Sequence, residues 1–318
     1  MGKKRKPGSS FFFGAAALFF LVLCCGEGVL IAQAQPHFTG SVQVRDLQFE
    51  YEAVGEGVPV VMIHGFGVDR ETMRGCMEPL FKNKTGWKRI YFDLPGMGKT
   101  KGPIWIQTSD HMLEAVREFI RQVIPGQKFL LVGESYGGYL CRGIVYKDAA
   151  SVLGMCLICP MGVAADADRD VPPQTIFKRD MAVYNDLDEG GKAFLDHLVA
   201  VQTKEVWDRF LAEMCSGWAK GDRAFQGALR YKVKNYTFSF AVDQLPQPFA
   251  GPSLILTGRQ DSGAGYRDQY RFLEQYPRAS FVILDMCGHI LQIEQPVLFN
   301  ALVDEWLDRV SWSMGGGK

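Results

Sequence analysis

Serine, aspartate and histidine, the residue types that cooperate in nucleophilic catalysis, occur in this chain in that order. Ser135 is the centre of residues 133–137, which have the spacing Gly-x-Ser-x-Gly. Asp261 and His289 follow in the second half of the chain. A serine hydroxyl becomes nucleophilic when a base takes its proton, and a carboxylate can hold that base in the required tautomer. These three residues therefore predict covalent hydrolysis through an acyl-enzyme.

The segment around Ser135 has the order strand, tight turn, helix. A short apolar run over residues 129–132 ends at Gly133, and a helical pattern follows the serine at once. In such a nucleophile elbow the turn is so tight that a side chain at position 133 or 137 would collide with neighbouring backbone. We expect the strained turn to lift the Ser135 hydroxyl clear of the sheet.

The predicted acid and base also follow strands. Asp261 comes just after the β-rich run 254–257, and His289 comes just after the run 281–284. Among the five histidines of the chain, His289 is the one that follows both the elbow and a late strand. Because the carboxyl ends of parallel strands meet at one edge of a sheet, the three side chains are expected to converge there.

Backbone N–H groups can stabilise a developing oxyanion without reorganising. We expect one from Tyr136, directly after the nucleophile, and the other from Phe66 in the sequence His-Gly-Phe-Gly. The side chains of Phe66 and Tyr136 are then expected to wall the pocket. His64 is predicted to brace this loop. Glu134 either tunes the elbow or points elsewhere, and we favour the second interpretation.

Short β-rich runs alternate with helical patterns, which is typical of a mostly parallel sheet covered by helices on both faces. The strand rhythm predicts an α/β core over residues 35–160 and 249–318, with a helix at about 265–275 in the second part. Between them, residues 161–248 have helical character and predict an inserted cap of about four helices. Four aromatic residues of this segment are candidates for an apolar substrate pocket: Tyr184, Trp207, Trp218 and Tyr231.

The chain resembles the α/β-hydrolase superfamily, in particular its lid-bearing members that act on small substrates. The resemblance implies the α/β-hydrolase fold, a triad of Ser135, Asp261 and His289, and no cofactor or metal. It also favours Asp261 over Asp285, because the family places its acid one strand before the histidine. Relatives of the dehalogenase and epoxide hydrolase types use an aspartate nucleophile, so Ser135 argues against those activities. The motifs that carry the resemblance are residues 64–67, 93–98, 133–137, 258–261 and 288–289.

The ends and the overall charge bear on location and partners. Residues 1–34 combine a basic start, an uncharged apolar stretch over 11–25 and small residues before Gln35, which predicts a cleaved export signal and a secreted or extracytoplasmic protein. An uncleaved membrane anchor is the alternative. Lys and Arg together number 35, and Asp and Glu together also number 35. The chain therefore has no net positive charge that would favour binding to nucleic acid or to an anionic membrane. We expect a small-molecule substrate; the sequence carries no signal for an oligomeric state.

The leading functional hypothesis is a serine hydrolase that cleaves an ester, or a related acyl or C–C bond, in a small, partly apolar substrate. Two alternatives stay open. An aminopeptidase would need cap carboxylates such as Glu205 or Glu213 to bind a substrate amine. A ligand-binding member of the fold would keep the architecture without turnover. The Cys-x-x-Cys at Cys156 and Cys159 lies in an apolar run, where small buried residues are expected rather than a metal site.

Overall fold

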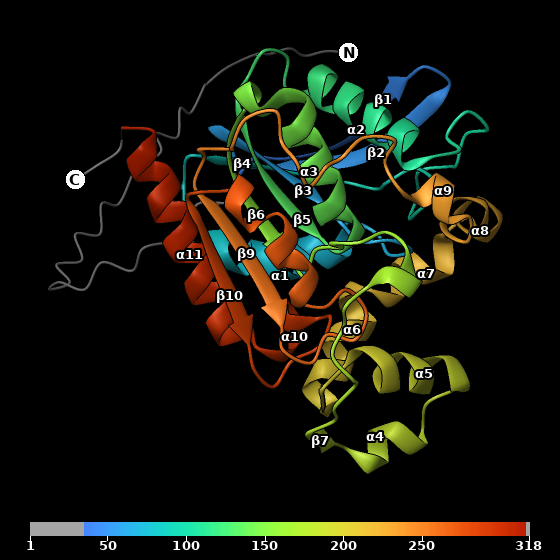
Figure 1. The fold of residues 1–318 in the computed structure, drawn as a ribbon. Helices are drawn as coiled ribbons and strands as arrows, with labels where there is room; N and C mark the ends of the chain where they lie inside the picture. Colours follow the sequence, from blue (N-terminus) through green and yellow to red (C-terminus); the bar gives the residue numbers. More distant parts are fainter. Residues whose placement is uncertain (1–34, 316–318) are drawn as a thin grey trace, which may run out of the picture. The chain divides into compact units, whose positions relative to one another are not determined.

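The computed structural model of the protein describes residues 35–315, so the predicted export signal in residues 1–34 lies outside the described residues. Its centre is an eight-stranded sheet with the order β1-β2-β4-β3-β5-β6-β9-β10 (Figure 1). The first two strands pair antiparallel and β2 runs antiparallel to β4, whereas all other neighbours are parallel. This sheet confirms the predicted α/β class. The strands are β1 (His37–Val44), β2 (Leu47–Val54), β3 (Val58–Ile63), β4 (Trp87–Phe92), β5 (Phe129–Glu134), β6 (Val152–Ile158), β9 (Ser253–Gly258) and β10 (Ala279–Leu284).

The sheet is buried on both faces, and each face has its own apolar core. Successive residues of a strand point to opposite faces, so in β3 the side chains of Val61 and Ile63 join one core while Val60 and Met62 join the other. Helices α2 and α3 cover the first face, and α1 and α11 cover the second (Figure 1). The helices of the core are α1 (Glu71–Phe81), α2 (Ser109–Val123), α3 (Tyr136–Asp148), α10 (Leu291–Glu294) and α11 (Pro296–Ser313).

Residues 159–252, here called the insertion, connect β6 to its neighbour β9. Six helices form in it, more than the four expected, because capping side chains interrupt the apolar pattern: Asp188, Thr203 and Asp222 each accept a hydrogen bond from a backbone N–H at a helix start. The insertion has its own apolar cluster, which also packs against Val68 and Ile290 of the core. Its elements are β7 (Lys178–Arg179), α4 (Met181–Asn185), α5 (Glu189–Leu198), β8 (Val201–Gln202), α6 (Lys204–Glu213), α7 (Cys215–Lys220), α8 (Arg223–Arg230) and α9 (Val233–Tyr236).

The prediction of one regular helix at about residues 265–275 is wrong in the type of helix. The chain forms two short 3₁₀ helices there, Arg267–Arg271 and Leu273–Gln275. In an α-helix the N–H of Gln269 would bond the carbonyl of Gly265, but here the Gln269 side chain takes that carbonyl. The backbone N–H of Gln269 bonds Tyr266 instead, which gives the tighter winding.

Within residues 35–315, no helix has the length and apolarity needed to cross a bilayer. The six cysteines of this part of the chain are all free thiols, and five of them are buried. Cys156 and Cys159 are both fully buried, as expected for core residues.

Candidate active site

Ser135 occupies a strained elbow between β5 and α3. Its backbone has φ 51° and ψ −115°, a conformation that costs energy in a residue with a side chain. The two flanking glycines permit this turn. A Cβ on Gly137 would lie 2.1 Å from the carbonyl oxygen of Ile63, and one on Gly133 would lie 2.6 Å from the carbonyl oxygen of Gly137. A side chain at either position would therefore collide with neighbouring backbone, as expected.

The three predicted residues lie in one hydrogen-bonded line. His289 Nε2 is 3.0 Å from Ser135 Oγ, and His289 Nδ1 is 2.9 Å from Asp261 Oδ2. A carboxylate accepts hydrogen bonds only, so Nδ1 carries a hydrogen and Nε2 can take the serine proton. Asp261 and His289 come from the loops after β9 and β10, so the carboxyl ends of three parallel strands supply the set.

The electrostatics of this line favour a charged pair. Burial acts to raise the pKa of Asp261, but His289 and the backbone N–H groups of Gly263 and Ala264 outweigh it and lower that pKa. Burial acts to lower the pKa of His289, but the contact with Asp261 and the nearby Glu134 raise it to about 9. The carboxylate is therefore held ionised and oriented, as a partner for an imidazolium must be.

The loop after β3 carries the predicted oxyanion donor Phe66. The N–H of Leu94 donates to His64 Nε2 at 2.9 Å, so Nδ1 must carry the hydrogen that it shares with the carbonyl oxygen of Gly65 at 2.7 Å. That carbonyl and the N–H of Phe66 belong to one peptide plane, so His64 sets the direction of the N–H. Tyr136 is the first residue of α3, and its N–H has no partner within the helix. His64 thus braces the loop, as expected.

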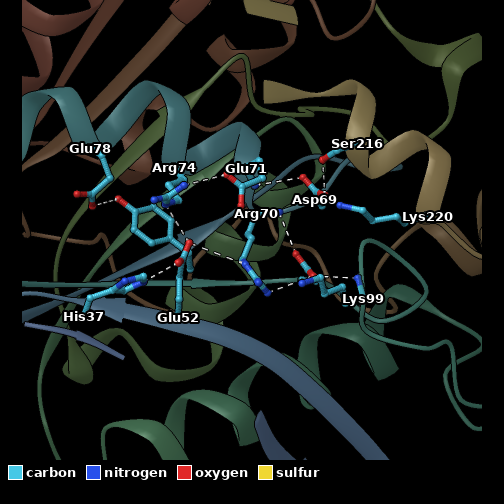
Figure 2. Close-up of polar contacts among 12 residues, drawn as sticks. His37, Glu52, Asp69, Arg70, Glu71, Arg74, Glu78, Lys99, Ser216 and Lys220 are labelled. Carbon is cyan, nitrogen blue, oxygen red and sulfur yellow. Dashed lines mark hydrogen bonds and ion pairs between the residues drawn. The ribbon is translucent and has the colours of Figure 1, made fainter. Parts of the chain in front are cut away.

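A polar network anchors the same loop to the sheet and to the insertion (Figure 2). Asp69 is buried, accepts a hydrogen bond from Ser216 Oγ at 2.8 Å and lies 3.6 Å from Lys220 Nζ, both on α7. The next residue, Arg70, donates its backbone N–H to Asp93 Oδ1 at 3.0 Å. Helix α7 also approaches the backbone of this segment closely at Gly217. This loop (residues 64–70), called the oxyanion loop below after its predicted role, is therefore held from both sides.

Glu134 is a site residue that the sequence interpretation missed. Its side chain does not point elsewhere: it is buried, Oε1 lies 3.8 Å from His289 Nε2, and the backbone of Gly65 bonds the carboxylate. Burial raises its pKa to about 7, with Asp261 adding to the effect and His289 opposing it. The available signal was an acidic residue at the end of an otherwise apolar strand, next to the nucleophile.

A second buried carboxylate joins the insertion to the histidine loop. Glu294 accepts backbone hydrogen bonds from Ala200 and Val201 at 2.8 and 2.9 Å and from Gly288 at 2.7 Å. The N–H of His289 in turn donates to the carbonyl oxygen of Leu198 at 2.8 Å. Glu294 was not singled out from the sequence, although its place in a run of buried residues before the last helix was a usable signal.

The four predicted pocket aromatics lie in the insertion, where the side chain of Tyr231 is largely exposed. Trp207 and Trp218 line a cavity of about 600 Å³ among α4–α7, and this cavity is not lined by Ser135, Asp261 or His289. The hydroxyl of Tyr184 donates to Asp196 at 2.7 Å. Near the nucleophile the aromatic contacts are different: Phe66 packs edge-on against Tyr136 and against Tyr236 of α9. The ring of Tyr136 is fully buried, so Phe66 walls the site more than Tyr136 does.

Cys159, Asp261 and His289 place one potential metal-ligating atom each within 4.8 Å of one another. The same carboxylate and imidazole already bond each other at 2.9 Å. Because Nδ1 carries the hydrogen that it shares with Asp261, this nitrogen offers no lone pair to an ion, and the contact suits proton transfer.

An elbow serine followed by an acid and a histidine at successive strand ends defines the α/β-hydrolase class. The chain belongs to this family, described as alpha/beta hydrolase fold, whose sequence pattern matches residues 58–296. A solved α/β superfamily hydrolase from Oenococcus oeni is 28% identical, with a TM-score of 0.76 over 86% of this chain and 99% of that one.

Two relatives illustrate the range of the family. A 2-hydroxy-6-oxo-6-(2'-aminophenyl)hexa-2,4-dienoic acid hydrolase of Metapseudomonas resinovorans is 23% identical over 84% of this chain and 90% of its own length. A pimeloyl-[acyl-carrier protein] methyl ester esterase of Legionella pneumophila is also 23% identical, over 82% of this chain and all of its own length. Both relatives are hydrolytic enzymes that span nearly the whole described chain.

Proposed function

We propose that the protein is a serine hydrolase that cleaves the ester bond of a small, partly apolar substrate. The observation that carries the proposal is the continuous line from Ser135 through His289 to Asp261. The distance from Ser135 Oγ to His289 Nε2 is 3.0 Å, and that from His289 Nδ1 to Asp261 Oδ2 is 2.9 Å. Both are within hydrogen-bonding range without any rearrangement. A serine held at a strained elbow beside such a pair has the geometry of an activated nucleophile.

In the proposed reaction, Ser135 Oγ attacks the ester carbonyl carbon while its proton passes to His289 Nε2. The carbonyl oxygen becomes an oxyanion, which the N–H groups of Phe66 and Tyr136 stabilise. The tetrahedral intermediate then expels the alcohol, which takes the proton from Nε2. Water repeats the sequence on the acyl-enzyme, so His289 first accepts its proton and then returns it to Ser135 Oγ.

The two cationic groups described beside the nucleophile, His289 and Arg169, are already paired within the protein. Asp261 and Glu134 place two buried carboxyl groups beside His289. Arg169 acts electrostatically on His289, but its guanidinium donates to the carbonyl oxygens of Val163, Ala164 and Gly263 and is therefore engaged. A dienoate would therefore find no unpaired cation in these two groups, whereas a neutral ester needs none. The methyl ester esterases among the relatives support the same choice.

The carboxylates considered for an aminopeptidase are used otherwise. Glu213 forms an ion pair with Arg209, with its Oε1 2.6 Å from Arg209 Nε. Glu205 is exposed in the first turn of α6, where its charge favours the helix start. Glu213 is thus committed to Arg209 and Glu205 faces solvent, so the ester is the better-supported substrate.

The test compares Ser135→Ala with the native protein on a neutral aryl ester and with a fluorophosphonate probe. Loss of the nucleophile should reduce turnover by roughly 10³-fold or more and abolish labelling. Ser151→Ala is the matched control, because the Ser151 hydroxyl bonds Asp148 at the end of α3 and is remote from the reaction. Near-native hydrolysis by Ser135→Ala would refute the proposal. A native protein that neither labels nor turns over a panel of esters would instead indicate a ligand-binding member of the fold.

A further inference from the structure

The imidazole of His289 lies between two carboxyl groups, one at each ring nitrogen. Asp261 bonds Nδ1 at 2.9 Å, and Glu134 Oε1 lies 3.8 Å from Nε2, on the side of the nucleophile. Glu134 is 2% exposed, so solvent screens this second contact little. The proposed hydrolytic reaction uses Asp261 but assigns no role to Glu134.

We propose that Glu134 is a positioning residue that stabilises the protonated ring of His289 and, through the backbone of Gly65, holds the oxyanion loop in place. The inference rests on the proposed function, since it concerns the proton that moves in that reaction. Its geometric basis is that one buried carboxyl group contacts both the base and the loop that carries the Phe66 N–H.

The proton transfer explains why a charge at this position matters. When Ser135 attacks, its proton moves from Oγ to Nε2 and a positive charge appears on the ring 3.8 Å from Glu134. The same attraction acts before substrate binds and adds to that of Asp261 in favouring a proton on the ring at neutral pH, where this proton blocks the base. Activity should therefore increase as pH rises and the ring loses that proton. Because the two groups interact strongly, they titrate as a pair.

Other charged or titratable groups also face His289. Asp261 comes from the loop after β9, and Arg169, from the segment after β6, acts to lower the pKa of the ring. The thiol of Cys159 lies near the same pair, and Glu294 acts on Asp261 from α10. Glu134 is the group whose charge can be removed by an isosteric change that leaves the Nδ1 partner in place. Glutamine also keeps an oxygen to accept the Gly65 N–H.

The experiment measures kcat/KM against pH for a neutral ester with native protein, Glu134→Gln and Asp285→Asn. Asp285 is an exposed carboxylate on the loop that leads to His289, so its removal is the matched control. We expect the rising limb of the Glu134→Gln profile to move to lower pH by about one to three units, the range for an adjacent buried charge. The Asp285→Asn profile should superimpose on the native one.

Two outcomes overturn the inference: a Glu134→Gln profile that matches the native one, or one displaced to higher pH. A second measurement covers a variant that fails to fold. In native protein labelled with ¹⁵N-histidine, the ring resonance of His289 is identified as the one that is absent from the spectrum of His289→Gln. This resonance should titrate above the ordinary histidine pKa of about 6.5. Titration at or below that value overturns the inference. If Ser135→Ala stays active, the proposed function fails; if it is inactive while the Glu134→Gln profile is unmoved, only this inference fails.

Discussion

The contact between α7 and the oxyanion loop makes Gly217→Ala an informative perturbation. A Cβ at position 217 would lie 2.3 Å from the backbone nitrogen of Asp69 and 2.4 Å from the carbonyl carbon of Val68. Ordinary carbon contacts are about 3.5–4.0 Å, so the two segments must separate by roughly 1 Å. Both neighbours are backbone atoms, so no side-chain rotation can relieve the clash.

The magnitude depends on which segment yields. If the loop moves, the Phe66 N–H two residues upstream of Val68 is displaced, and a shift of about 1 Å can cost about 10²-fold in kcat. If α7 moves, the overpacking costs roughly 1–3 kcal/mol of unfolding free energy, offset by about 1 kcal/mol from replacing glycine in a helix. We expect Gly217→Ala to lose activity, stability or both.

The assay pairs urea unfolding with kcat on a neutral aryl ester, and Gly227→Ala is the control. Gly227 also lies in a helix of the insertion, but a Cβ there would meet the ring of Tyr231 at an ordinary 3.6 Å. That variant should keep the native kcat and gain up to about 1 kcal/mol in stability. Should Gly217→Ala behave like Gly227→Ala, the reasoning that couples α7 to the oxyanion loop is refuted.

Two further predictions concern the buried carboxylates. Glu294→Ala leaves three backbone N–H groups without their acceptor. We therefore expect it to lower the unfolding free energy by about 3–5 kcal/mol, measured by urea unfolding at pH 8. A loss below about 1 kcal/mol would contradict the role of Glu294. The pKa of Glu134 and of Glu294 is raised from 4.5 to about 7 in the folded protein, so the folded state binds more protons than the unfolded state between these values. The unfolding free energy should therefore fall as pH rises from about 4.5 to about 7, by roughly 3 kcal/mol per group, and Glu294→Gln should flatten the dependence; a rise over that interval would contradict it.

The sheet and the convergence of the three chemical groups could be predicted because both depend on chain order. Apolar runs ending at Gly133, Gly258 and Leu284 predict parallel strands, and parallel strands bring the loops at their carboxyl ends to one edge of the sheet. The side chains of Ser135, Asp261 and His289 then need only short loops to meet. The choice of Asp261 over Asp285 additionally required the resemblance to the family, which places its acid one strand before the histidine.

The features that could not be predicted depend on side-chain direction and on competing hydrogen bonds. Strand periodicity places Glu134 on a face of the sheet, but it does not state that the carboxyl group reaches both Gly65 and His289. The 3₁₀ helices after Gly265 arise because the Gln269 side chain takes a carbonyl that an α-helix would use. In the insertion, spacing identified Trp207 and Trp218 as apolar but could not distinguish a wall of the active site from a cavity elsewhere.

The insertion begins and ends on neighbouring strands, since β6 pairs directly with β9 and Ile158 lies opposite Leu256. Its two attachment points are therefore close together whatever its length or sequence. An exchange of this segment for one from another family member would leave the register of every strand unchanged, but the new segment would have to replace the contacts that hold the loops of Asp69 and His289. Chimaeric proteins could therefore be built by cutting at the same two points, provided that the new segment restores these contacts.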